Sequence, residues 1–84
     1  MRSWMIKIEV RLYATLLTYC PALKAGEPLV LELGTGTTVA QLLENLAIPA
    51  NNVQLVFVNG RMQGQSYILA EGDRVAFFPP VGGG

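Results

Sequence analysis

The chain has 84 residues, 51% of them apolar, and its six basic residues balance six acidic ones. This length suits one domain with a thin core rather than two domains, and the apolar content excludes an intrinsically disordered chain. The balanced charge argues against nucleic-acid or anionic-membrane partners, while the lack of histidine and the single Cys20 exclude an intrachain disulfide, a histidine-dependent catalytic centre and a four-cysteine metal site.

The N-terminal region shows no export signal. Lys7, Glu9 and Arg11 interrupt the apolar run that a signal peptide needs, and no stretch is long enough to span a bilayer. We therefore expect a cytoplasmic protein, in which residues 1–4 form a lead before the first strand.

Two stretches alternate with a period of two, the pattern of half-buried strands. Residues 6–12 place aliphatic side chains on one face and charged side chains on the other, and residues 29–33 repeat the pattern with leucines. Residues 13–27 between them are irregular, with a short turn expected at residues 14–17. The two strands are close enough in sequence to form a hairpin.

One helix is expected after the glycine-containing turn at residues 34–36. Thr38 and Gln41 fit a capping box, in which each side chain bonds the backbone N–H of the other residue. Apolar residues then recur at helical spacing, and Pro49 stops the helix at Ile48. We expect a helix of about ten residues that depends on tertiary packing for its stability.

The C-terminal half predicts three further strands. The β-branched and aromatic run at residues 53–58 indicates a strand near the centre of the sheet. Asn59-Gly60 is typical of a type I′ hairpin turn, which leads into a brief strand at residues 61–62. A loop covers residues 63–70, and the last strand, at residues 74–78, ends at two prolines that cannot donate to a sheet.

The order of elements is therefore ββαβββ. A helix with a single apolar stripe must cover one face of a mixed sheet of about five strands. This order predicts an α+β fold of the β-grasp (ubiquitin-like) roll type, with residues 1–84 as a single domain.

Three groups of residues could be read as sites, but each has a simpler structural explanation. Glu71 and Asp73 lie two apart in a predicted turn, and turn formation explains them better than acid–base catalysis. Cys20 has no histidine to activate it. The segment at residues 34–38 precedes the helix but lacks the lysine and the spacing of a phosphate-binding loop. The sequence therefore predicts no catalytic residue and no metal ligand within the chain.

The C-terminal segment carries the strongest functional signal. Two prolines hold the exit from the last strand extended, and the four residues after them span on the order of 13 Å when fully extended. A glycine tip has no Cβ and fits a slot too narrow for any side chain. We therefore expect residues 79–84 to form a flexible tail that delivers the terminal carboxylate into another protein's active site; the alternative is a frayed end without a role. The residues expected to thread that site are Pro79, Pro80, Val81, Gly82 and Gly83, with Gly84 at the tip.

A partner surface is expected on the sheet face opposite the helix. Alternation in the last strand, with its valine and its first phenylalanine packed on the helix, leaves the other three side chains on the open face. Two valines of the preceding strand are expected to join them in an apolar patch with charged edges, which is typical of a partner site; the alternative, that a loop covers the two valines, stays open. The residues expected on this surface are Arg74, Ala76, Phe78, Val56 and Val58.

These motifs together resemble the MoaD/ThiS family of ubiquitin-like sulfur carriers, most closely the small subunits of molybdopterin synthases. The resemblance is most specific at the C-terminus and weakest over residues 13–27. The motifs that carry it are Met5-Ile6-Lys7-Ile8, Thr38-Val39-Ala40-Gln41-Leu42-Leu43, Val58-Asn59-Gly60, Gly72-Asp73-Arg74-Val75-Ala76 and Phe77-Phe78-Pro79-Pro80-Val81-Gly82-Gly83-Gly84.

The resemblance implies a protein that carries sulfur without catalysing its transfer. An ATP-dependent adenylating enzyme of the ubiquitin-activating type would adenylate the Gly84 carboxylate, and a persulfide donor protein would replace AMP by sulfur to give a thiocarboxylate. The large subunit of molybdopterin synthase would accept the tail, and the sulfur would enter the dithiolene of the molybdenum or tungsten cofactor. The chain itself would bind no cofactor. Gly82 departs from the family pattern, in which many members carry a small side chain.

Three other functions stay open from the sequence. A related carrier would serve thiamine thiazole synthesis or another thiolated product. A ubiquitin-like modifier would form isopeptide bonds through Gly84. A plain binding module would make no use of the terminal glycines.

Overall fold

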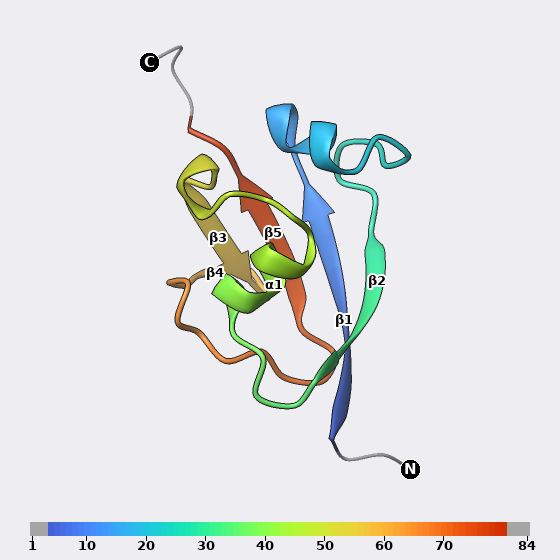
Figure 1. Ribbon diagram of the computed structural model, residues 1–84, viewed down its shortest axis with the longest axis vertical. Helices are drawn as coiled ribbons and strands as arrows, with labels where there is room; N and C mark the ends of the chain where they lie inside the picture. The colour runs from blue at the N-terminus through green and yellow to red at the C-terminus, as the bar shows by residue number, and fades with distance from the viewer. Residues whose placement is uncertain (1–3, 81–84) are drawn as a thin grey trace.

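The computed structural model describes residues 4–80 as one mixed five-stranded sheet with a short helix across one face (Figure 1). The strands are β1 (Met5–Leu12), β2 (Leu29–Gly34), β3 (Leu55–Val58), β4 (Arg61–Met62) and β5 (Arg74–Phe78), the helix is α1 (Val39–Asn45), and two 3-10 turns are η1 (Ala14–Tyr19) and η2 (Ala50–Asn52). The strands lie in the order β2-β1-β5-β3-β4, with β1 and β5 parallel and the other neighbours antiparallel. The predicted order ββαβββ is confirmed.

β1 and β2 form the predicted hairpin because their alternating side chains share a face. The four aliphatic side chains of β1 are at most 7% exposed and belong to the core: Ile6, Ile8, Val10 and Leu12. The pairing extends beyond the strands, since the Thr35 N–H donates to the Trp4 carbonyl oxygen at 2.7 Å. β1 begins at Met5, so Trp4 precedes the strand, and residues 1–3 lie outside the described residues.

α1 begins where predicted and ends earlier. The Gln41 N–H donates to Thr38 Oγ1 at 3.2 Å, and the Thr38 N–H donates to Gln41 Oε1 at 3.0 Å, so the capping box is confirmed. The helix has seven residues instead of about ten, because Ala47 takes a positive φ of 59° and turns the chain. None of the helices between residues 4 and 80 is long and apolar enough to cross a membrane.

The middle of the sheet is β5, which lies between β1 and β3. Val75 and Phe77 of β5 are at most 1% exposed. The run at residues 53–58 was expected near the centre; its last four residues form β3, which lies one place from the middle strand. β5 takes the middle place because β1 pairs with it in parallel on the other side.

The hairpin turn predicted after β3 is confirmed. Asn59 and Gly60 have φ angles of 54° and 82°, the two positive values that a type I′ turn requires. The stretch from β4 to β5 is a loop with one isolated bridge, between Thr38 and Ile68, as its only strand-like pairing among the described residues.

The predicted position of Val56 and Val58 on the open face is wrong. Their side chains are 4% and 2% exposed and pack in the core. Residues directly opposite each other in an antiparallel pair share a face, and β3 pairs these two valines with the two inward-facing residues of β5. The other side chains of β3, Leu55 and Phe57, therefore take the open face.

Candidate functional site

The open face is the face of the sheet turned away from α1, behind the sheet in the view of Figure 1. β5 presents Arg74, Ala76 and Phe78 there, as the alternation predicts. β3 adds Leu55 and Phe57 beside them. The open face thus combines apolar side chains from two adjacent strands with a cationic one.

Three aromatic rings form a fixed cluster on the open face. Phe78 stacks on Tyr13 with ring centroids 4.6 Å apart and planes 6° apart, and Phe57 meets Phe78 edge-on at 5.7 Å. Such pairs contribute about 0.5–1.5 kcal/mol each beyond the area they bury. Neither Tyr13 nor Phe57 was predicted here, although the alternation of β1 continued by one residue places Tyr13 on this face.

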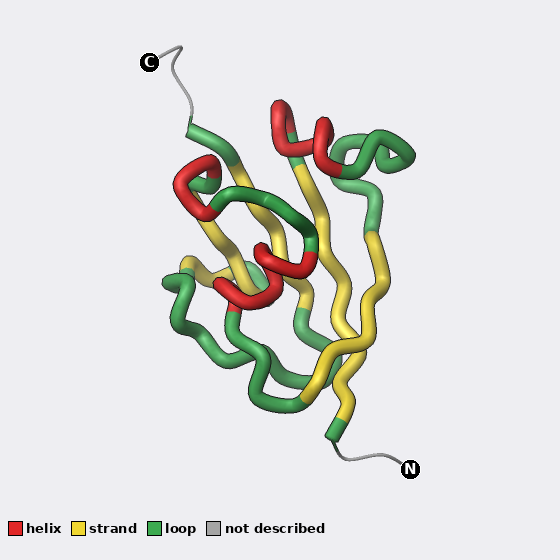
Figure 2. Tube along the Cα trace, in the orientation of Figure 1, coloured by secondary structure: helices red, strands yellow, loops and turns green. Residues whose placement is uncertain are grey.

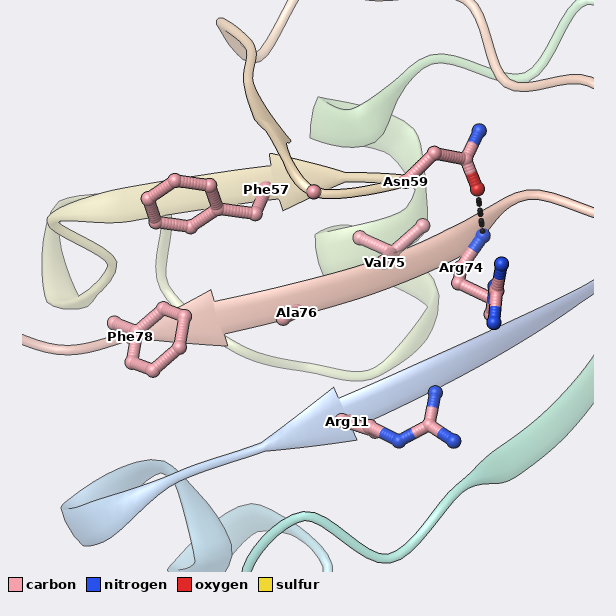
Figure 3. A pocket seen from close by; sticks show the side chains of 8 residues that line it. Arg11, Phe57, Asn59, Arg74, Val75, Ala76 and Phe78 are labelled. Atoms are coloured by element: carbon pink, nitrogen blue, oxygen red, sulfur yellow. Dashed lines mark hydrogen bonds between the residues drawn. The ribbon is translucent and has the colours of Figure 1, made fainter.

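An open depression of about 580 Å³ lies on this surface. Figure 3 shows the rings of Phe57 and Phe78 at one end and the guanidinium groups of Arg11 and Arg74 at the other, with Ala76 between them. Because alanine has only a methyl group, the floor of the depression stays low. The result is an apolar floor with a basic rim.

Hydrogen bonds fix the backbone and one arginine at this rim. Arg11 Nε donates to the Gly26 carbonyl oxygen at 3.1 Å, and its Nη1 lies 3.1 Å from Glu9 Oε1 in a surface ion pair. The Arg74 N–H donates to Asn59 Oδ1 at 3.0 Å, the dashed line of Figure 3. Aromatic and arginine side chains are enriched where proteins dock, so this depression suits a partner that offers apolar contacts framed by acidic groups.

The root of the predicted tail is anchored at the end of β5. The Gln54 N–H donates to the Phe78 carbonyl oxygen at 2.8 Å, which extends the pairing of β3 with β5 by one step. Pro79 is buried and Pro80 is exposed, and neither can donate to a sheet. The predicted tail residues 81–84 lie outside the described residues.

The carboxylates before β5 have structural partners. Asp73 is 5% exposed, and its carboxylate accepts the Ala70 N–H at 2.8 Å and the Asn59 Nδ2–H at 2.9 Å. Glu71 Oε1 accepts the Lys7 N–H at 3.0 Å. The turn-forming explanation of Asp73 is confirmed.

The remaining sequence candidates also have structural positions. Thr37 Oγ1 donates to the Gly34 carbonyl oxygen at 2.6 Å, so the segment before α1 is a turn that ends in a cap. Cys20 is half-buried after η1 and packs partly against the core. In the part of the chain that the structure describes, no three histidine, cysteine, aspartate or glutamate residues are placed to hold a metal ion.

Comparison with known proteins gives a family match and a fold match. The ThiS family matches residues 21–84, and no curated protein sequence matches the chain. The solution structure of the HVO 2177 protein from Haloferax volcanii has a TM-score of 0.76 and 23% identity, covering 100% of this chain and 92% of that one. SAMP1 from the same organism has a TM-score of 0.69 and 24% identity, covering 93% and 99%.

A third structure comes from Pyrococcus furiosus and is provisionally assigned as molybdopterin converting factor, subunit 1. It has a TM-score of 0.69 and 23% identity, covering 90% of this chain and 99% of that one. At these identities the likeness concerns the fold, and the β-grasp architecture predicted from the order of elements is confirmed.

Proposed function

Because the chain belongs to the ThiS family, we propose that it is a non-catalytic, ubiquitin-like sulfur carrier whose C-terminal glycine, Gly84, is converted to a thiocarboxylate. The observation that carries the proposal is the extent of the family match, which runs through Gly83 and Gly84. The position of Pro79 supports it, because this buried residue attaches the tail to the end of the middle strand.

The proposed chemistry begins with a carboxylate, which is a poor electrophile until it has a good leaving group. A carboxylate oxygen attacks the α-phosphorus of ATP, pyrophosphate leaves, and an acyl adenylate forms. The terminal sulfur of a persulfide donor protein then attacks the acyl carbon and AMP leaves. A thiol cleaves the resulting sulfur–sulfur bond by reduction, and one sulfur stays on the glycine as a thiocarboxylate. The adenylating enzyme and the donor supply the catalytic groups, and the carrier supplies reach and a narrow tip.

We further propose that the sulfur is used for the dithiolene of molybdopterin, through the large subunit of a molybdopterin synthase. The stalk at residues 77–80 supports this choice through its resemblance to the synthase small subunits, and the provisional assignment of the Pyrococcus furiosus protein agrees with it. A ubiquitin-like modifier is the second candidate, because SAMP1 shares the fold and is a small archaeal modifier protein. Thiamine thiazole synthesis is the alternative for the sulfur.

Mass spectrometry tests the carrier function. Incubation of the 84-residue protein with the adenylating enzyme of the same genome, ATP and a persulfide donor is expected to raise the intact mass by one oxygen-to-sulfur exchange, which fragmentation locates at Gly84. An unchanged mass contradicts the proposal. Complementation of strains that lack the molybdopterin or the thiazole carrier distinguishes the two pathways, and lysine-linked conjugates in extract would favour the modifier.

We propose that the adenylating enzyme docks on the open face. The aromatic cluster and the depression of about 580 Å³ lie on the same strand, β5, that leads into the tail. A partner seated on this face is therefore close to the point from which the carboxylate is delivered.

Replacement of Ala76 by glutamate is expected to raise the KM of the adenylating enzyme for this protein about 30-fold, equivalent to about 2 kcal/mol. Ala76 lies between the rings and the guanidinium groups of the depression, so the larger side chain fills its floor. The fold should tolerate the change, because β1 places the positively charged Arg11 opposite the new carboxylate at position 76. Initial rates of ATP–pyrophosphate exchange measure the effect.

The matched control is Ala70→Glu, which makes the same change in an exposed loop. The control should leave KM within about twofold of wild type, as a surface substitution away from the interface does. Equal KM values for the two variants would show that the enzyme docks elsewhere.

A further inference from the structure

The root of the tail lies between two segments that are far apart in the sequence. η1 and η2 stand at the end of the sheet from which the chain leaves β5 (Figure 2). One hollow of about 280 Å³ is lined by Leu16 and Tyr19 of η1, Asn52 of η2, and both Pro79 and Pro80. The path of the chain at the prolines is therefore bounded by the two turns.

One hydrogen bond joins two of the residues that line this hollow. Asn52 Nδ2 donates to Tyr19 Oη at 2.6 Å and joins η1 to η2 across 33 residues. The Tyr19 ring packs partly against the core, whereas the bond itself is exposed. Core packing therefore accounts for the position of the Tyr19 ring, but it does not account for the contact between the Tyr19 hydroxyl and Asn52.

Each turn is also fixed independently of this bond. Leu16 anchors η1, with 1% of its side chain exposed, and Gln65 Nε2 donates to the Ala50 carbonyl oxygen of η2 at 3.3 Å. Because other contacts hold both turns, the hydrogen bond between Tyr19 and Asn52 sets the spacing between η1 and η2 and is not needed for either turn to form.

We propose that Tyr19 and Asn52 are positioning residues, whose hydrogen bond holds η1 and η2 as a collar around Pro79 and Pro80 and so sets the direction in which the tail leaves the domain. The inference rests on the proposed function, since direction matters only when the carboxylate is delivered to an enzyme. Proline fixes φ and leaves ψ free. The prolines alone stiffen the stalk, and the walls of the hollow determine where it points.

The length of the tail amplifies any change at the collar. The four residues beyond Pro80 span on the order of 13 Å when extended, so for a tail drawn out straight inside the enzyme a tilt of about 20° at the root moves the tip by about 4 Å. Reacting atoms must come within about 3–3.5 Å of each other. A small tilt is thus enough to take the carboxylate out of reach of ATP, while contacts on the open face stay unchanged.

The test is the steady-state kinetics of adenylation for Tyr19→Phe, Asn52→Ala and the double variant, with thermal unfolding of each. We expect kcat to fall about threefold to tenfold with KM within about twofold of wild type. The double variant should fall no further than either single variant, because both changes remove the same bond. The matched controls are Tyr67→Phe, at a loop residue that does not line the hollow, and Asn51→Ala, at the exposed neighbour of Asn52 in η2; both should keep the wild-type kcat.

The possible results separate the collar from the carrier function. If the wild type is adenylated and the variants keep its kcat, or if kcat falls equally in the controls, the collar alone is overturned. A rise in KM at constant kcat also overturns it, because the two residues would then contact the enzyme directly. No adenylation of the wild type overturns the proposed function, and the collar with it.

Discussion

Deletion of Gly83 and Gly84 is expected to reduce kcat/KM for adenylation at least about 100-fold, because the deletion shortens the tail by about 7 Å and reacting atoms must approach within about 3–3.5 Å. The truncated chain still ends in a glycine carboxylate, so the loss reports reach rather than the chemistry of the terminal group. None of the core residues found between residues 4 and 80 is removed, and the melting temperature should stay within about 2 °C of wild type. Pyrophosphate exchange and thermal unfolding measure the two quantities.

Gly82→Ala is the control for this deletion. It keeps the length of the tail and adds one methyl group at a position where the resemblance implies that a small side chain is accepted. Adenylation should stay within about threefold of wild type. Adenylation of the truncated chain with the wild-type kcat/KM would contradict a mechanism in which the tail must reach into the enzyme.

The parts of the fold that depend on local patterns were predictable from the sequence. The alternation of β1 identifies its buried face without knowledge of its neighbours. Thr38 and Gln41 cap α1, and Asn59-Gly60 forms the type I′ turn, because each motif satisfies its geometry within four residues. The end of α1 was less predictable, since the positive φ of Ala47 has no local signature in an alanine.

Features that depend on register were not predictable. All four residues of β3 are apolar, so their pattern does not distinguish the two faces, and only the pairing of Val56 with Phe77 assigns them. The bond between Tyr19 and Asn52 joins residues 33 positions apart in two irregular segments. Such contacts follow from the assembled sheet and have no periodicity to reveal them.

Two adjacent phenylalanines show how the fold separates stability from binding. Phe77 is fully buried between β1 and β3, where its partners in the register are Leu12 and Val56. Phe78, one residue later, lies on the open face in the aromatic cluster. Because a strand alternates its faces, the same side chain at neighbouring positions should have different consequences when it is removed.

Phe77→Ala is expected to lower the free energy of unfolding by about 3–5 kcal/mol, because it removes a fully buried ring and leaves a cavity at the centre of the sheet. A domain of this length has a total stability of about 4–13 kcal/mol, so the loss removes a large share of the total and the variant should unfold at a much lower urea concentration than wild type. Urea denaturation followed by far-UV circular dichroism is the appropriate measurement, since Trp4 is 64% exposed and its fluorescence reports the core poorly.

Phe78→Ala is the matched comparison. Its ring is half-buried and open to water on the outer side, so removal leaves no closed cavity and should cost about 1–2 kcal/mol, mainly through the lost contacts with Tyr13 and Phe57. The two variants should differ in the opposite sense in their KM for the adenylating enzyme. Phe78→Ala should raise KM, whereas the folded fraction of Phe77→Ala should keep the wild-type KM. Equal losses of stability in the two variants would contradict the assignment of Phe77 to the core and Phe78 to the docking surface.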